Sequence, residues 1–280
     1  RISFAHSAET SRKESPSDLC DRLFIMDTWF WENKLDASQQ AEILKRLGSR
    51  KATESRNRWD EFPQVLETFD RDGIDMVAVY VRLSIDDKEL PGFFAPLIES
   101  LKGRKTLIWL NLVSQSYKPS DAAGDPSARK IVSAAADLAE PADLSISLYH
   151  HRGDWMERIG DTFRLAEACD RKNVGCTFNL YHWLFNDGGD RLEETAKKVL
   201  PRLNSVTING AMKNTAGTDV RAAILPLGEG DYDVESFVRT FVKLGYRGPI
   251  GLQGYGIGGE IEKKLASSLE VWRGYCGRIK

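Results

Sequence analysis

Two histidines stand just after predicted strands, where an imidazole could move a proton. His151 follows the apolar run 143–150, and His182 follows the run 173–180. An imidazole titrates near about pH 6.5, so two of them facing one substrate can take up a proton and return it. We therefore predict that His151 and His182 act as the catalytic acid and base. The competing interpretation for His182 is a structural histidine packed under Trp183.

Side-chain amides stand at the ends of three successive predicted strands, at Asn179, Asn209 and Gln253. Amides are poor bases, but their NH2 groups donate hydrogen bonds to hydroxyl groups or to a developing enolate. Acidic and phenolic side chains stand at the ends of other predicted strands. We expect all of these positions to bind substrate: Asp27, Glu54, Tyr80, Tyr149, Asn179, Asn209 and Gln253.

Short apolar runs alternate with longer amphipathic stretches along the chain, a pattern typical of βα units and a parallel sheet. The predicted strands are 22–28, 51–54, 74–83, 106–113, 143–150, 173–180, 205–210 and 249–253. The predicted helices are 37–47, 60–72, 91–101, 127–139, 155–170, 191–200, 234–244 and 261–275.

Eight such units predict an α/β fold, a single (β/α)8 TIM barrel over residues 21–280, with a short flexible N-terminal lead-in over residues 1–20. A chain of 280 residues is a normal length for this architecture. Since active sites of such barrels lie at the C-terminal ends of the strands, the candidate residues are expected to share one face.

Composition and charge limit the classes of partner that this protein is expected to bind. A net charge of -2 gives no electrostatic reason to expect nucleic acid or an anionic membrane surface. No apolar run approaches the roughly 20 residues that cross a bilayer. The cysteines lack a C-x-x-C pair, which argues against a zinc knot, and Cys169 and Cys176 are expected to be ordinary buried thiols. A small-molecule carbohydrate is the expected partner, and a homo-oligomer stays open.

Three long strings carry a family resemblance. The segments FNLYHWL (178–184), SVTINGA (205–211) and GPIGLQGYG (248–256) resemble the last three strands of the xylose-isomerase-like barrels. The more specific resemblance is to the subgroup of sugar phosphate isomerases/epimerases, and it extends over about residues 23–273. The chain departs from that subgroup at His150, where the subgroup has proline, and around 48–57, where a Gly-rich pattern is missing.

The resemblance also implies a changed metal site. Metal-dependent members of the family hold a divalent ion with three carboxylates and a histidine at strand ends. The matching positions here are neutral: Tyr149, Asn179, Asn209 and Gln253. A hard dication depends on negatively charged oxygen ligands, so the inherited metal site is predicted to be lost and no cofactor is expected. The alternative is a residual divalent-metal site built from His151, His182, Asp27 or Glu54.

The resemblance implies a sugar isomerase or epimerase that moves a proton next to a carbonyl. One alternative is a lyase or hydrolase on keto-sugars or glycosides, which would pass through the same enolate. A non-enzymatic alternative is a carbohydrate-binding relic of a decayed metal enzyme. Localisation stays open: the chain begins with Arg1, so an exported or periplasmic protein is expected if a signal peptide was removed, and a cytoplasmic one otherwise.

Overall fold

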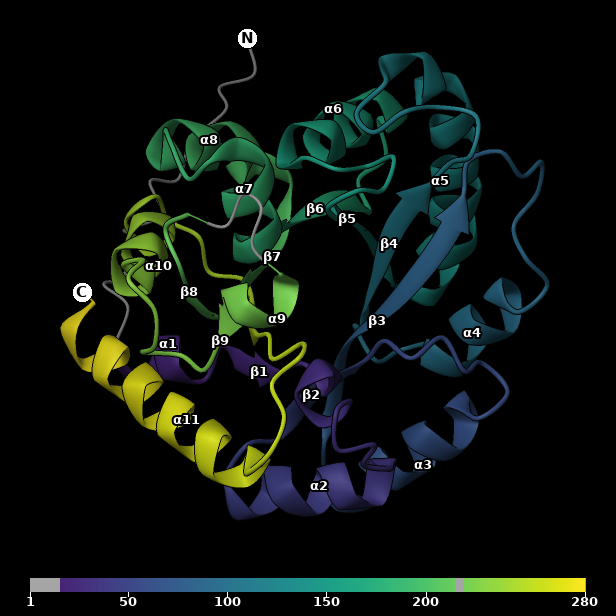
Figure 1. The fold of residues 1–280 in the computed structure, drawn as a ribbon. Coiled ribbons are helices and arrows are strands. Elements are labelled where there is room, and N and C mark those ends of the chain that lie inside the picture. The colour runs from purple at the N-terminus through teal and green to yellow at the C-terminus, as the bar shows by residue number, and fades with distance from the viewer. Residues whose placement is uncertain (1–15, 215–218, 280) are drawn as a thin grey trace, which may run out of the picture.

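The computed structural model describes residues 16–214 and 219–279, and the fold is a closed barrel of eight parallel strands (Figure 1). The strands follow one another around the barrel in the order β1-β10-β7-β6-β5-β4-β3-β2. They are β1 (Leu23–Ile25), β2 (Lys51–Glu54), β3 (Asp75–Ser84), β4 (Leu107–Val113), β5 (Ser145–Tyr149), β6 (Val174–Asn179), β7 (Leu203–Ile208) and β10 (Ile250–Leu252). The predicted single (β/α)8 barrel is confirmed.

Helices cover the outside of the barrel (Figure 1). They are α2 (Ala37–Arg46), α3 (Phe62–Asp72), α4 (Phe94–Leu101), α5 (Asp125–Ala139), α6 (Ile159–Cys169), α7 (Leu180–Asp187), α8 (Leu192–Val199), α10 (Val234–Lys243) and α11 (Ile261–Arg278). A short β8 (Gly210–Ala211) pairs antiparallel with β9 (Ile224–Leu225), and α9 (Val220–Ala223) precedes β9. In the described part of the chain, no helix is long and apolar enough to span a membrane.

Several elements differ from the sequence-based expectation. The first strand ends at Ile25 rather than at residue 28, so Asp27 lies in a short 3-10 helix (Asp27–Phe30). Helix α6 begins at Ile159 rather than at residue 155. Helix α7 follows β6 directly, because the Asn179 side chain accepts a hydrogen bond from the His182 backbone N–H and caps the new helix. His182 therefore lies in the first turn of a helix rather than in a loop.

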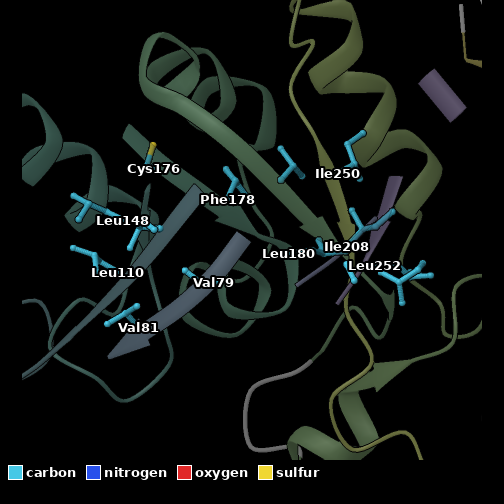
Figure 2. Close-up of a cluster of buried hydrophobic side chains, with 14 of the residues drawn as sticks. Val79, Val81, Leu110, Leu148, Cys176, Phe178, Leu180, Ile208, Ile250 and Leu252 are labelled. Carbon is cyan, nitrogen blue, oxygen red and sulfur yellow. The ribbon is translucent and has the colours of Figure 1, made fainter. Parts of the chain in front are cut away.

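Side-chain alternation divides the strands into an outer and an inner layer. Outward-facing residues such as Val79, Leu148, Phe178 and Leu252 belong to the large buried cluster that includes the helices, part of which Figure 2 shows. The smaller interior cluster contains Phe24, Met26, Ala78, Trp109 and Tyr149. The barrel interior is therefore a packed core rather than a pore.

Hydroxyl groups form a polar layer inside the barrel. Thr177 Oγ1 lies 2.7 Å from both Ser147 Oγ and Ser205 Oγ, and the Trp109 indole N–H donates to Ser205 Oγ at 3.1 Å. All four residues are fully buried. This layer satisfies its own hydrogen bonds beneath the mouth of the barrel.

A disulfide joins the beginning and the end of the described chain. Helix α1 (Pro16–Cys20) packs against α11, and Cys20 is bonded to Cys276 over a sequence separation of 256 residues. The predicted flexible lead-in thus needs a correction at its end, since residues 16–20 form this helix; residues 1–15 lie outside the described residues. Cys169 and Cys176 are free and buried, as expected.

Breaking this disulfide is expected to lower the free energy of unfolding by about 2–4 kcal/mol, because an open chain gains conformational entropy when it unfolds. The measurement is urea unfolding of the wild-type protein with and without a thiol reductant. The double variant Cys20→Ser/Cys276→Ser is the control, and the reductant should leave its stability unchanged. Equal stability of the oxidised and reduced wild-type protein would contradict the prediction.

Candidate active site

A cavity of about 640 Å³ opens at the C-terminal ends of the strands. Its wall contains five of the nine predicted site residues: Tyr80, Tyr149, His151, His182 and Gln253. It also contains Met26, Thr28, Trp31, Ser55, Asn57, Arg82, Arg152, Asp154, Tyr181, Asp219, Val220, Ile224 and Tyr255. The barrel therefore brings both predicted catalytic histidines to one cavity.

His182 is held as a neutral hydrogen-bond donor. Its Nδ1 accepts the backbone N–H of Arg152 at 3.2 Å, so the proton of the neutral ring resides on Nε2. Burial, followed by the nearby His151, His150 and Arg152, lowers the pKa of His182 well below its ordinary value. The ring is 4 % exposed and lines the cavity, and Nε2 has no protein partner in the described part of the chain. His182 is suited to donate a hydrogen bond and unsuited to accept a proton.

His151 is held in the opposite tautomer. Its Nδ1 lies 3.0 Å from the Arg152 carbonyl oxygen and 3.0 Å from Asp154 Oδ2. Both of these atoms are acceptors, so Nδ1 carries the proton of the neutral ring and Nε2 keeps its lone pair. The Asp154 carboxylate is ion-paired with Arg82 through Oδ1, and its buried Oδ2, which faces His151, has no hydrogen-bond partner among the described residues. His151 is therefore suited to accept a proton, and Asp154 to stabilise the resulting imidazolium.

The two imidazoles lie side by side, with their ring centroids 4.3 Å apart and their planes inclined by 48°. One ring presents an acceptor nitrogen and the other a donor N–H. Two phenols complete this wall, with the rings of Tyr80 and Tyr149 5.3 Å apart. Burial raises the pKa of both phenols, so both are neutral donors or acceptors.

Asn179 organises the site from behind the cavity wall. Its Nδ2 lies 2.5 Å from Tyr149 Oη, 2.7 Å from Thr207 Oγ1 and 2.9 Å from Gln253 Oε1. Its Oδ1 caps α7 through the His182 N–H. Because Gln253 accepts through Oε1, its Nε2 is left as a donor for the cavity, where Gln253 lines the wall.

Four predicted substrate-binding residues do not line the cavity: Asp27, Glu54, Asn179 and Asn209. The structure therefore places these four residues, which the sequence predicts to bind substrate, outside the wall of the cavity. The side-chain amide of Asn209 is held by its own backbone, because its Nδ2 donates to the adjacent Gly210 carbonyl at 2.8 Å. Its Oδ1 is buried and has no partner in residues 16–214 and 219–279.

Asp27 is fully buried and has several donors of its own. Its carboxylate accepts hydrogen bonds from the Thr53 hydroxyl at 2.8 Å, the Ser55 hydroxyl at 2.6 Å and the Trp31 indole at 2.9 Å. Side chains alternate along a strand, so Thr53 of β2 and Ser55, which directly follows β2, point into the barrel, whereas Glu54 between them points the other way. Ser55 rather than Glu54 therefore reaches the cavity wall.

Glu54 should make stability depend on pH. Burial, and secondarily Asp27, raises its pKa from an ordinary 4.5 to about 7. The folded protein then holds a proton that the unfolded chain has lost, so this contribution to stability is fully present below about pH 4.5 and is lost as the pH rises through 7.

Glu54→Gln does not have this titrating carboxyl group. As the pH rises from 4.5 to 8, the unfolding free energy of wild type should therefore fall by about 2–3 kcal/mol relative to that of the variant. Chemical unfolding at several pH values measures this difference. The control is Glu67→Gln on the exposed face of α3, which should track the wild-type curve. Parallel curves for wild type and Glu54→Gln would show that Glu54 is ionised in the folded protein.

Comparison with known proteins assigns the chain to a protein family. The family model described as xylose isomerase-like TIM barrel matches residues 44–275, and the chain belongs to this family. Membership supports an enzyme in general. A search of curated proteins finds no match.

Solved structures share the fold at low sequence identity. The IOLI protein, whose structure is described with a bound zinc atom, is 14% identical with a TM-score of 0.71, and the match covers 92% of this chain and 97% of that one. The 3-keto-D-glucoside 4-epimerase YcjR from E. coli is 13% identical with a TM-score of 0.69, covering 90% and 99%. The probable 3-DHS dehydratase AsbF from Bacillus anthracis is 13% identical with a TM-score of 0.69, covering 89% and 97%.

The family resemblance matches four strand-end positions of this chain to the metal ligands of metal-dependent relatives. The matching positions are neutral: Tyr149, Asn179, Asn209 and Gln253. Asn179 is already committed at both of its polar atoms, and Asn209 points its amide nitrogen to Gly210. Within the described residues, no group of three or more His, Cys, Asp or Glu side chains is arranged to hold a metal ion.

Proposed function

We propose that this protein catalyses proton transfer at a carbon next to the carbonyl group of a sugar-like substrate. His151 Nε2 takes the proton, and the His182 Nε2–H and the Gln253 amide donate hydrogen bonds to the carbonyl oxygen as it becomes an enolate. The observation that carries the proposal is the pair of adjacent imidazoles in opposite tautomers at the cavity. A decayed binding site has no need of this arrangement.

The proton now on His151 has two destinations. Returning it to the opposite face of the same carbon completes an epimerisation. Giving it to the former carbonyl carbon, while the hydroxyl proton of the first carbon moves to the enolate oxygen, completes an isomerisation. Giving it to a leaving group on the β-carbon completes an elimination: the carbonyl re-forms, a Cα=Cβ bond forms, and the bond from the β-carbon to the leaving group breaks. The neighbours named as an epimerase and as a dehydratase are examples of these two reaction classes. We favour the isomerase or epimerase, because the strings 178–184, 205–211 and 248–256 resemble sugar isomerases and epimerases.

This mechanism assigns electrophilic assistance to neutral donors of the protein rather than to a divalent metal. A neutral imidazole can polarise a carbonyl without giving up its proton fully, provided its pKa is low. Elemental analysis of purified protein tests this part of the proposal. One tightly bound divalent ion per chain, lost together with thermal stability on chelation, would overturn it.

The test of the reaction is solvent exchange. A panel of keto-sugars and 3-keto-glycosides is incubated with the protein in D2O, and the recovered material is analysed by mass spectrometry and NMR. Deuterium in recovered substrate or its epimer supports the isomerase or epimerase. Loss of a leaving group identifies the lyase instead. Binding of these compounds without exchange or elimination would leave the non-catalytic carbohydrate-binding protein as the function.

The Cys20–Cys276 disulfide also bears on localisation. Disulfides form and persist in oxidising environments such as the bacterial periplasm and the extracellular space. We therefore propose an exported location. Alkylation of thiols in intact cells of the natural source should leave these two cysteines unmodified, and their modification would contradict the proposal.

A further inference from the structure

One guanidinium group at the cavity has no carboxylate partner among residues 16–214 and 219–279. Arg152 lies between His151 and Gly153, in the loop that follows β5, and its half-buried side chain lines the cavity. The other guanidinium on the cavity wall, Arg82, is ion-paired with Asp154. In the described part of the chain no carboxylate forms an ion pair with Arg152, although Asp219 lines the same cavity.

Neutral contacts hold this cation in place. Its Nη1 donates to the Tyr181 hydroxyl at 3.0 Å, and its guanidinium carbon lies 3.5 Å from the centre of the Phe185 ring. Its backbone N–H is bound to His182 Nδ1 and its backbone carbonyl to His151 Nδ1. The cation is thus ordered before any ligand binds, and most of its five N–H donors remain available.

A fixed guanidinium with free donors in a partly desolvated cavity is a site for an oxyanion. Carboxylates and phosphates accept two parallel hydrogen bonds from such a group, and these charge-assisted bonds are about twice as strong as neutral ones. Aromatic stacking against Phe185 orients the guanidinium plane without neutralising its charge.

We propose that Arg152 binds an anionic group of the substrate, so that the natural substrate is an acidic sugar carrying a carboxylate or a phosphate. This inference rests on the proposed function, because it places the anion in the cavity of the histidine pair. The backbone of Arg152 sets the tautomers of both histidines, while its side chain would anchor the substrate beside them.

Equilibrium binding tests the proposal without requiring turnover. Isothermal titration calorimetry compares D-glucuronate, D-glucose 6-phosphate and D-glucose on the wild-type protein. At least one of the two anions should bind about tenfold or more tightly than glucose, and added salt should reduce the difference. Preference for glucuronate identifies a carboxylate as the anion, and preference for the 6-phosphate identifies a phosphate.

The variant Arg152→Gln removes the charge but keeps the backbone contacts to the histidines and an NH2 group near Tyr181. It should lose the preference for the anion. Arg171→Gln is the matched control, since Arg171 pairs with Asp137 on the outer surface, and this variant should keep the preference. Equal affinity of all three sugars for the wild-type protein, or an unchanged anion preference in Arg152→Gln, would overturn the proposal.

His151→Gln separates this inference from the proposed function. It should retain the anion preference while losing exchange. Anion preference in a wild-type protein that catalyses no exchange or elimination would support the subsite and reject the reaction. Exchange that is equally fast on neutral and on anionic sugars, and that Arg152→Gln leaves unaltered on both, would support the reaction and reject the subsite.

Discussion

His151→Gln is expected to slow deuterium exchange into substrate by about a hundredfold to ten-thousandfold, the usual contribution of a positioned general base. Glutamine is similar in size and polar, but it cannot accept a proton near neutral pH. The His151 side chain is 41% exposed, so its replacement should leave the fold intact. The measurement is the exchange rate at saturating substrate, with circular dichroism to verify folding.

The neighbouring histidine supplies the control for this prediction. His182→Gln keeps an N–H donor near the position of Nε2, whereas His182→Ala does not. If His182 acts as a neutral donor, the glutamine variant should retain more exchange activity than the alanine variant. A His151→Gln protein that exchanges at the wild-type rate would remove His151 from the role of base.

Asn179→Ala is expected to cost about 3 kcal/mol or more of unfolding free energy. The substitution leaves the Gln253 carbonyl oxygen and the His182 backbone N–H without their partner, in a place where Asn179 itself is fully buried. Each buried polar group left unpaired costs about 1–3 kcal/mol, and a lost helix cap costs about 1 kcal/mol. Urea unfolding measures the change.

Asn111→Ala is the matched control. Asn111 is also a fully buried asparagine on a barrel strand, but among the described residues its side chain makes a single long hydrogen bond, from Nδ2 to the Tyr149 carbonyl at 3.4 Å. Its Oδ1 is already unpaired in the described structure. The same truncation there should cost clearly less. Equal losses at the two positions would mean that the Asn179 hydrogen bonds add nothing beyond side-chain volume.

The amino-acid sequence by itself determined the architecture. Apolar runs separated by amphipathic stretches specify parallel strands with covering helices, and the known geometry of such barrels places all C-terminal strand ends on one face. That reasoning was sufficient to bring His151, His182 and Gln253 together. The string HRGD (151–154) also contained the partners of His151, since Arg152 and Asp154 follow it within three residues.

Only the tertiary structure decided what each side chain can do. The direction of a side chain in β2 depends on local register, and an irregularity between Ala52 and Thr53 accompanies the inward placement of Ser55 rather than Glu54. The roles of the histidines depend on which nitrogen meets a donor, and for His182 that donor is a backbone N–H 30 residues away.

The pairing of cysteines far apart in the sequence was likewise decided only by the tertiary structure. Cys20 and Cys276 are 256 residues apart, and only closure of the barrel brings α1 against α11. Periodicity reports which face of an element is buried, because burial follows from local alternation of apolar residues. Periodicity carries no information about which distant donor or acceptor a polar atom will pair with. Those hydrogen bonds decide which nitrogen of each histidine carries the proton, and the proposed chemistry depends on that.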